Sequence, residues 1–283
     1  MINTICVCGA GTMGSGIAQV CAQAGYVTIQ FDVNAEMVAK SKLAIEKGFR
    51  TMVDKARMTA EEMQAASSNL IFTSDINNCK ADIVIEAIIE KLDAKVSLFN
   101  QLSSQNSHDT IFATNTSSLS ITEVSKEVEN PSRVVGMHFF NPAPVMKLVE
   151  VVKGENTSIE TAEQVYDLVY KLGKTAVMCK DAPGFIVNRV ARPYYLQAMK
   201  MAEMGMEIEA IDKLMEATGF KMGPFKLMDL IGMDINYSVS NIVWEALGKP
   251  ERLEPSSLQK QKVDAGNLGK KSGKGFYDYN SKV

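Results

Sequence analysis

The first 32 residues hold the feature that most constrains how this chain folds. An apolar run, 2–8, leads into the glycine-rich turn Gly9-Ala10-Gly11-Thr12-Met13-Gly14, which is followed by a helical pattern and by a second apolar run that ends in Asp32. Strand, G-x-G-x-x-G turn, helix, strand and acid, in this order, form the dinucleotide-binding fingerprint. The sequence therefore predicts strands and helices that alternate around a parallel sheet, with a dinucleotide at the glycine turn.

The glycine turn and Asp32 favour NAD(H) as this dinucleotide. The three glycines permit the tight turn, the approach of the pyrophosphate and the close packing of the helix, whose amino end attracts the phosphates. Asp32 is placed to accept both hydroxyls of the adenosine ribose, and it would repel the 2′-phosphate of NADP(H). The alternative, a glycine turn without a cofactor, is disfavoured by the strand–helix–strand context. The cofactor-binding residues predicted here are Gly9, Gly11, Thr12, Met13, Gly14 and Asp32.

Alternating apolar runs and helical patterns continue up to a break at Pro183, after which helical periodicity dominates. Strands are expected at 2–8, 26–32, 69–73, 81–85, 110–114 and 174–179, with a strand–turn–strand between 134 and 152. Helices are expected beyond the break at 185–204, 208–218 and 234–247. The prediction is an α/β protein, with a Rossmann-like, mostly parallel sheet domain at residues 1–183 and an all-helical C-terminal domain at residues 184–283. A helical domain rich in Met and Leu is typical of a dimer interface, so we expect a homo-oligomer, either a dimer or a multiple of dimers.

One helix is expected after 157, with Gly173 at its end. Its spacing predicts an inner face formed by Ile159, Ala162, Tyr166 and Val169. The glycine-rich segment at 269–279 is expected to be an ordered turn.

The composition excludes several classes of protein. With 283 residues, 46% hydrophobic residues and a net charge of −3, the chain resembles a globular protein and not a general nucleic-acid binder. No apolar run approaches about 20 residues, and no targeting segment is recognised, so we expect neither a membrane span nor export. The five cysteines are odd in number and lack metal-site spacing, which predicts reduced thiols, no bound metal and a cytoplasmic location.

The segment 134–152 is predicted to carry the chemistry, because it places His138 and Glu150 in two apolar, strand-like runs on either side of a proline-containing turn. Both residues have even numbers, so they face the same side if the strands pair about that turn. A carboxylate that accepts the imidazole N–H fixes the tautomer and raises the basicity of the other nitrogen. The alternative is a core histidine with a glutamate partner and no catalytic role.

Polar residues gather where two of the predicted strands end, which is the edge where ligands meet an open α/β sheet. Glu86 and Glu90 follow the strand at 81–85, and Asn115-Thr116-Ser117-Ser118 follows the strand at 110–114. Asn115 and Ser117 are expected to hydrogen-bond nicotinamide and substrate. The alternative is that this cluster caps the next helix.

A basic helix is predicted between 35 and 57. Its apolar side is expected to hold Val38, Ile45, Phe49, Met52 and Val53. Six basic residues against two acids lie between 40 and 57, although the whole chain is acidic. Such a pattern is commonly a solvated helix face. The second interpretation is that these residues form a surface that binds a polyanionic carrier such as coenzyme A. The basic residues are Lys40, Lys42, Lys47, Arg50, Lys55 and Arg57.

Five motifs together closely resemble the (S)-3-hydroxyacyl-CoA dehydrogenase family, and their positions span the whole chain. They are G-A-G-T-M-G at 9–14, N-T-S-S at 115–118, H-F-F-N-P-A-P at 138–144 with K-L-V-E at 147–150, K-D-A-P-G-F-I-V-N-R at 180–189 and S-G-K-G-F-Y-D-Y at 272–279. In length and in the lack of a targeting segment, the chain is most similar to the bacterial 3-hydroxybutyryl-CoA dehydrogenases.

The resemblance implies a role for each matching residue. His138 would be the base that removes the hydroxyl proton as hydride leaves C3 for NAD⁺, and Glu150 would hold its imidazole. Ser117 and Asn188 would bond the substrate oxygen or the neighbourhood of its thioester. Lys55, with Arg50 beside it, would contact the CoA thioester. The residues that would surround the cofactor are Asp32, Glu90, Lys95, Asn141 and, from the C-terminal tail, Lys274.

Two positions depart from the family pattern. The family often has a serine seven residues before the lysine that matches Lys55, and here the residue is Gly48, which puts the neighbouring CoA contact in doubt. Arg192, in the helix that follows Asn188, is unusual, and the sequence does not show its effect.

Two other classes of protein share part of this sequence pattern. A 6-phosphogluconate or 3-hydroxyisobutyrate type dehydrogenase shares the two-domain plan but uses a lysine base in a glycine-rich helix, which this chain lacks. A catalytically silent NAD-binding structural protein is the other alternative. Such a protein would have no physical need for His138, Glu150, Ser117 and Asn188 together.

Overall fold

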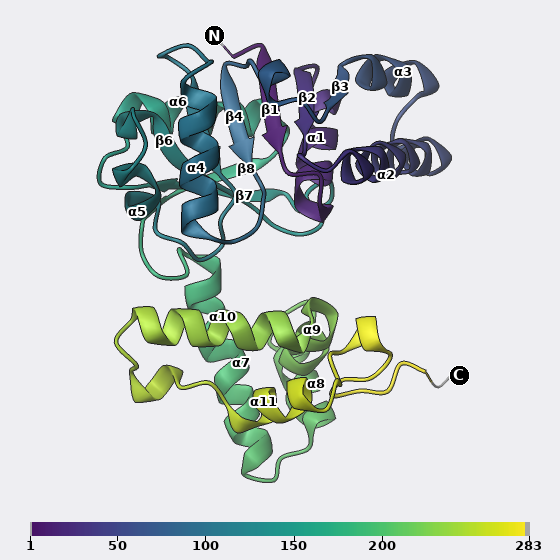
Figure 1. Ribbon diagram of the computed structural model, residues 1–283. Helices are drawn as coiled ribbons and strands as arrows, with labels where there is room; N and C mark the ends of the chain where they lie inside the picture. The colour runs from purple at the N-terminus through teal and green to yellow at the C-terminus, as the bar shows by residue number, and fades with distance from the viewer. Residues whose placement is uncertain (1, 281–283) are drawn as a thin grey trace. The chain divides into compact units, whose positions relative to one another are not determined.

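A computed structural model of the chain describes residues 2–280, which form two compact units that divide between Ala182 and Pro183 (Figure 1). The first unit is built around one eight-stranded sheet with the order β3-β2-β1-β4-β5-β6-β7-β8. All neighbouring strands are parallel except β6 and β7. The strands are β1 (Thr4–Cys8), β2 (Val27–Phe31), β3 (Leu70–Thr73), β4 (Ile83–Glu86), β5 (Ile111–Thr114), β6 (Val134–Phe139), β7 (Leu148–Lys153) and β8 (Thr175–Lys180). The predicted mostly parallel sheet is confirmed.

Helices cover both faces of this sheet, as the nearly continuous apolar strands require. Along β5, Phe112 packs against Phe99 of α4, whereas its neighbours Ile111 and Ala113 point into the core on the opposite face. The helices of the unit are α1 (Thr12–Gln23), α2 (Ala35–Asp54), α3 (Ala60–Ser68), α4 (Leu92–Ser103), α5 (Ile121–Lys126) and α6 (Ile159–Lys171). Short 3₁₀ turns lie at η1 (Ile76–Asn78) and η2 (Pro131–Arg133).

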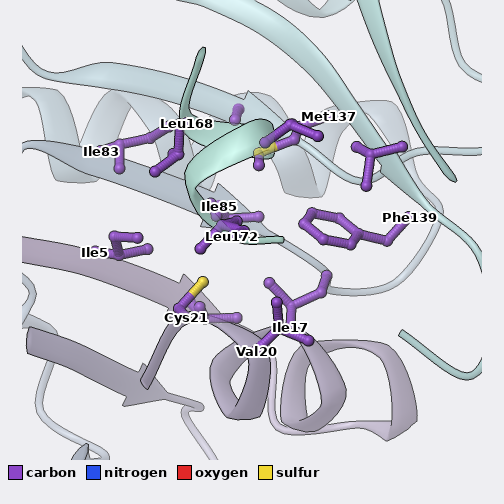
Figure 2. Close-up of a cluster of buried hydrophobic side chains, with 14 of the residues drawn as sticks. Ile5, Ile17, Val20, Cys21, Ile83, Ile85, Met137, Phe139, Leu168 and Leu172 are labelled. Carbon is purple, nitrogen blue, oxygen red and sulfur yellow. The ribbon is translucent and has the colours of Figure 1, made fainter. Parts of the chain in front are cut away.

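The core on this opposite face joins α1 and α6 to the strands (Figure 2). Cys21 of α1 lies near Ile5 of β1, and Phe139 of β6 reaches toward Ile17 of α1. Leu168 of α6 belongs to the same buried cluster. The helix that carries the glycine turn is therefore fixed to the central strands by buried apolar contacts.

The predicted inner face of α6 was partly wrong. Ala162 and Val169 are buried, but Ile159 is 59% exposed and Val165 is fully buried. At about 100° per residue, the buried stripe that includes Val165 and Leu168 is centred roughly 120° away from Ile159. The helix therefore faces the sheet with a different side from the one predicted.

The second unit is helical and has its own core, formed by residues such as Leu196, Met199, Phe225 and Met228. Its helices are α7 (Val187–Glu203), α8 (Ile208–Ala217), α9 (Pro224–Ile231), α10 (Met233–Ala246) and α11 (Ser257–Asp264), with 3₁₀ turns η3 (Glu251–Leu253) and η4 (Lys270–Ser272). The three predicted helices are confirmed. Helices α9 and α11 were not predicted, because they have eight residues each and so show little periodicity.

The C-terminal tail is ordered, as predicted, because it is bonded to a buried carboxylate. Asp229 accepts hydrogen bonds from the amides of Phe276 and Tyr277, and from the hydroxyl of Tyr279. A Cβ on Gly275 would lie 2.1 Å from this carboxylate, so the close approach requires glycine. Within residues 2–280, no helix is both long enough and apolar enough to cross a bilayer.

Candidate active site

The backbone of the glycine turn excludes side chains at two of its three glycines. Gly9 has a φ of 103°, and a Cβ there would lie 2.4 Å from the carbonyl oxygen of Ala87. A Cβ on Gly14 would lie 1.7 Å from the carbonyl oxygen of Gly9, whereas one on Gly11 would meet no described atom within 4 Å. Among the described residues, no side chain caps α1 and no acid lies in its first turn. This open, donor-rich helix end fits the pyrophosphate of a dinucleotide.

Asp32 follows β2 and is held beside this turn. One of its carboxylate oxygens accepts the amide of Ala10 at 2.8 Å, and the other accepts the amide of Asn34 at 3.0 Å. A carboxylate that is oriented by two amides keeps acceptor capacity for the hydroxyls of a ribose. The geometry is therefore that of the fingerprint in which an acid binds the adenosine ribose.

The register of the sheet places several polar residues on one face. Glu86 of β4 is level with Thr114 of β5, and Thr114 is level with Gly136 of β6. His138 lies two residues beyond Gly136, so it points to the same face, away from the core beneath α1 and α6. The polar loops after β4 and β5 lie at the same strand ends.

His138 and Glu150 form a buried pair across the antiparallel strands β6 and β7. The two residues are direct partners in the ladder, and His138 Nδ1 lies 2.7 Å from Glu150 Oε2. They are 6% and 1% exposed, and the ring of Phe140 lies 4.5 Å from the imidazole, centroid to centroid. Because a carboxylate can only accept, we assign the proton of this bond to Nδ1, which leaves Nε2 as the nitrogen that exchanges protons. The pairing predicted from parity is present in the structure.

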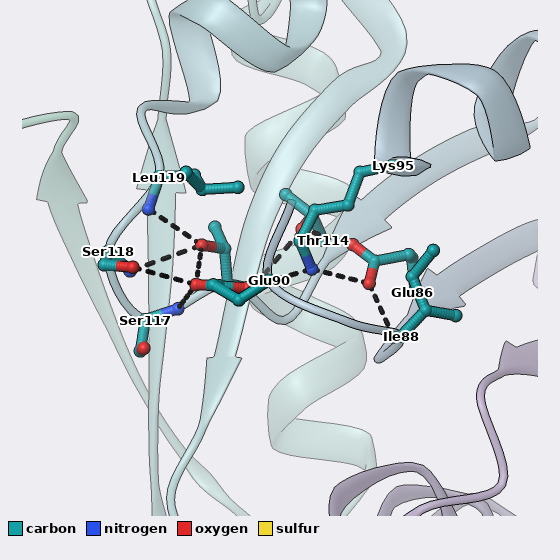
Figure 3. Close-up of polar contacts among 9 residues, drawn as sticks. Glu86, Ile88, Glu90, Lys95, Thr114, Ser117, Ser118 and Leu119 are labelled. Carbon is teal, nitrogen blue, oxygen red and sulfur yellow. Dashed lines mark hydrogen bonds and ion pairs between the residues drawn. The ribbon is translucent and has the colours of Figure 1, made fainter. Parts of the chain in front are cut away.

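A second buried charge cluster connects the loops after β4 and β5 (Figure 3). Lys95 Nζ, on α4, lies 2.6 Å from Glu86 Oε1 and 3.1 Å from Glu90 Oε2. Glu86 also accepts the hydroxyl of Thr114 at 2.7 Å and the amide of Ile88 at 2.7 Å. The lysine therefore lies between two carboxylates, and its side chain is only 1% exposed.

Glu90 holds the loop that contains Ser117 (Figure 3). Its Oε1 accepts the hydroxyl of Thr116 at 2.5 Å, the amide of Ser117 at 3.0 Å and the hydroxyl of Ser118 at 3.0 Å. Burial raises the pKa of Glu90, but the charge of Lys95 and the donors from Thr116 and Ser117 outweigh it, so the pKa is lowered from its ordinary value. The polar cluster does not cap the next helix, because Ser120 caps α5.

The two asparagines predicted to lie near the cofactor occupy different positions. Asn115 Oδ1 accepts the amide of Phe139 at 2.8 Å, so it ties the end of β6 to the loop after β5. Asn141 is exposed, in the turn between β6 and β7, where the Asn141–Pro142 peptide is cis.

The basic helix predicted between 35 and 57 is α2, but the helix ends at Asp54, so Lys55 and Arg57 follow it instead of lying on it. All six basic side chains are exposed. Val38, Ile45 and Phe49 are buried on the other side, as predicted, whereas Met52 and Val53 are only half-buried. At Gly48, a Cβ would lie 2.6 Å from Oε1 of Gln19, so the glutamine of α1 occupies the space that a side chain at this position would need.

Asn188 and Lys274 belong to the second unit. Asn188 is the second residue of α7, and Lys274 is an exposed residue of the ordered tail. The unusual Arg192 is buried, and its guanidinium donates to the carbonyl oxygens of Asn188 and Asn236 and to the hydroxyl of Ser240. Burial lowers the pKa of Arg192 to about 10. Arg192 therefore links the start of α7 to α10, which the sequence could not indicate.

The five cysteines are unpaired and buried. Cys6 and Cys8 point to one face of β1, as residues two apart in a strand do, with their sulfurs 3.7 Å apart.

Two family models match the chain. Residues 4–182 match the NAD binding domain of 3-hydroxyacyl-CoA dehydrogenase, and residues 184–279 match the C-terminal domain of 3-hydroxyacyl-CoA dehydrogenase.

Individual relatives agree with these models. The chain is 45% identical, over 98% of its length, to a 3-hydroxyadipyl-CoA dehydrogenase of Escherichia coli (strain K12), and it spans 59% of that protein. It is 43% identical to a probable 3-hydroxybutyryl-CoA dehydrogenase of Bacillus subtilis (strain 168), with 100% of this chain and 99% of the relative covered. The crystal structure of 3-hydroxybutyryl-CoA dehydrogenase from Escherichia coli K12 superimposes with a TM-score of 0.97 at 44% identity, which covers 100% of this chain and 61% of that one.

Proposed function

The chain belongs to the 3-hydroxyacyl-CoA dehydrogenase family, and from this membership we propose that it interconverts short-chain (S)-3-hydroxyacyl-CoA and 3-ketoacyl-CoA thioesters. It is an oxidoreductase, and NAD is its cofactor. The pair (S)-3-hydroxybutyryl-CoA and acetoacetyl-CoA is the first to test. The Bacillus subtilis relative, 99% of which this chain covers, is named as a probable 3-hydroxybutyryl-CoA dehydrogenase.

The observation that carries the proposal is the buried His138–Glu150 pair at the edge of the sheet that also holds the glycine turn. Gly9 follows β1 directly, and Cys8 at the end of β1 is level with Glu86 of β4. The glycine turn and the His138–Glu150 pair therefore lie at the same end of the sheet, at the carboxyl ends of the parallel strands, which is where ligands bind open α/β sheets.

In the reduction, NADH when bound supplies hydride to C3 of the substrate. His138, as imidazolium, donates the Nε2 proton to the developing alkoxide, and the Glu150 carboxylate stabilises the charged ring that gives up this proton. In the oxidation, neutral His138 accepts the hydroxyl proton. A positioned acid or base of this kind contributes about 10²- to 10⁴-fold to the rate.

The other site residues have supporting roles in the proposal. Ser117 and Asn188 bond the substrate oxygen or the neighbourhood of the thioester, and Asn115 and Asn141 lie at the nicotinamide end. Lys274 reaches the cofactor from the tail. Lys95 acts on the cofactor through Glu90, since its 1% exposure leaves no surface for direct contact.

The exposed basic side chains of α2 and of the residues just after it support a contact to the phosphates of coenzyme A. Arg50 and Lys55 are exposed on a chain whose net charge is −3. A local positive surface attracts a polyanion even when the whole molecule is acidic.

A homo-oligomer and a cytoplasmic location are also part of the proposal. Val190 of α7, Leu214 of α8 and Ile235 of α10 are large apolar residues exposed on the helical unit, which supports burial against a second copy. The five unpaired thiols support a reducing compartment.

The test is to follow NADH oxidation with acetoacetyl-CoA, with longer 3-ketoacyl-CoA thioesters and with 3-oxoadipyl-CoA, which is the keto form of the 3-hydroxyadipyl-CoA in the name of the Escherichia coli relative. We expect turnover with acetoacetyl-CoA and none with free acetoacetate. Absence of turnover with every thioester would refute the proposed reaction, and a preference for 3-oxoadipyl-CoA would reassign the substrate.

A further inference from the structure

Lys174 is a buried cation that neither the sequence motifs nor the proposed mechanism uses. The residue is 8% exposed, and none of the ion pairs among residues 2–280 includes it. Its Nζ donates instead to two backbone carbonyls, that of Ala143 at 2.6 Å and that of Met146 at 2.9 Å. Burial lowers the pKa of Lys174 from its ordinary value. Burial of an ammonium group without a carboxylate partner costs free energy. The groups that Lys174 does contact therefore indicate its role.

Both carbonyls belong to the loop at 140–147, which joins the two strands of the proton-transfer pair. The loop begins after Phe139, one residue beyond His138, and ends before Leu148, two residues ahead of Glu150. It also contains Asn141, which the proposed function places beside the cofactor.

The loop also packs on α1, the helix that follows the glycine turn. A Cβ on Gly16 would lie 3.1 Å from Cδ of Pro144 and 3.2 Å from Cβ of Ala143, so the loop packs directly on this glycine. Inside the loop, the amides of Val145 and Met146 both donate to the carbonyl of Pro142 at 3.0 Å. The loop is therefore a compact turn that contacts both Gly16 and Lys174.

A simple role as a cap for α6 does not explain these contacts. Lys174 follows Gly173 at the end of that helix, but its Nζ bonds carbonyls 31 and 28 residues earlier in the chain. Its neighbour Thr175 donates its amide to the carbonyl of Lys147 at 2.8 Å, so the start of β8 holds the same loop.

We propose that Lys174 is a positioning residue, which presses the loop at 140–147 against the pyrophosphate-binding helix and so sets Asn141 and the His138–Glu150 strands relative to the dinucleotide. This inference rests on the proposed function. It predicts that loss of the lysine weakens dinucleotide binding and slows turnover, without a change in the KM for the thioester.

The test compares the full-length protein with Lys174→Met, which keeps the length of the side chain but removes its charge and its donors. NADH affinity is measured from the fluorescence of NADH itself, which requires no substrate. We expect binding weaker by about tenfold, a loss of about 1.4 kcal/mol, and a kcat lower by at least about tenfold, since small misplacements at a site have effects of that size. Lys174→Arg, which keeps a cation and several donors, should recover most of both quantities. Lys171→Met, at an exposed site on α6, is the matched control and should leave both unchanged.

A purely structural lysine would lower the thermal unfolding midpoint and leave the NADH affinity of the folded protein unchanged, and that result overturns the proposal. Should Lys174→Met fail to fold, Lys174→Leu, which also removes the charge and every donor, is measured instead, and wild-type NADH affinity in that variant overturns the proposal equally. If the wild type fails to reduce acetoacetyl-CoA, the proposed substrate is wrong, while the NADH affinities still decide the role of Lys174.

Discussion

His138 and Glu150 are direct partners across two antiparallel strands, and their side chains meet at 2.7 Å with almost no exposure to solvent. Fixed in this way, the imidazole has one defined tautomer and one orientation. The arrangement joins a proton donor and its charge partner to a rigid part of the sheet, and the predictions below test what it does.

Replacement of the imidazole should separate chemistry from binding. His138→Gln is expected to lower kcat by about 10²- to 10⁴-fold, because the proton donor is lost, while NADH affinity stays within a few-fold of the wild type. Steady-state turnover of acetoacetyl-CoA and NADH fluorescence titration measure the two quantities. Near-normal turnover would show that His138 is not the acid.

Glu150→Gln should slow turnover while the histidine remains in place. The amide oxygen of the glutamine can still accept a hydrogen bond from the Nδ1–H group, but its lack of charge removes the stabilisation of the imidazolium. We expect kcat to fall and NADH affinity to be preserved. A kcat equal to that of the wild type would mean that turnover does not require the charge of Glu150.

Asp32 should determine the choice between the two nicotinamide dinucleotides. The wild type is expected to prefer NADH, and Asp32→Ala should narrow the ratio of kcat/KM for NADH to that for NADPH, since both the ribose contacts and the repulsion of the 2′-phosphate are lost. Steady-state kinetics with both dinucleotides measure the ratio. A wild-type preference for NADPH would contradict the assignment of the ribose pocket.

The contacts of Glu90 should make part of the stability depend on pH. Its folded-state pKa is lowered, so its contribution is fully present above the ordinary glutamate pKa of about 4.3 and is lost as the pH falls through the lowered value. The difference in thermal unfolding midpoint between wild type and Glu90→Gln should therefore be largest above this pKa and should shrink below it. A difference that is independent of pH would argue against an ionised Glu90 as the holder of the Ser117 loop.

The basic face of α2 should affect thioester binding and not chemistry. Lys55→Glu is expected to raise the KM for acetoacetyl-CoA with little change in kcat, and the wild-type KM should rise with salt because exposed charges are screened. Lys171→Glu, on an exposed part of α6, is the matched charge control. If Lys55→Glu and added salt both leave the KM unchanged, α2 is a solvated face.

Much of the architecture could be predicted from local patterns. The strand–glycine–helix–strand order, the amphipathic character of α2 and the shared parity of His138 and Glu150 are written in short-range periodicity, which follows from the 3.6-residue helix and the two-residue strand repeat. Short elements were predicted less well. The eight-residue helices α9 and α11 were missed, and the buried side of α6 was placed incorrectly because four candidate positions do not fix the angle of a helix against a sheet.

By itself, the sequence determined the fold class, the dinucleotide fingerprint with Asp32, and the residue types of the site, because these depend on neighbours a few positions apart. Only the tertiary structure decided that Glu150 is level with His138, that Lys95 lies buried between Glu86 and Glu90, and that Lys174 holds the loop at 140–147. These facts depend on strand register and on which polar groups lose water together. Both are set by packing between segments far apart in the chain, and such packing cannot be predicted from local periodicity.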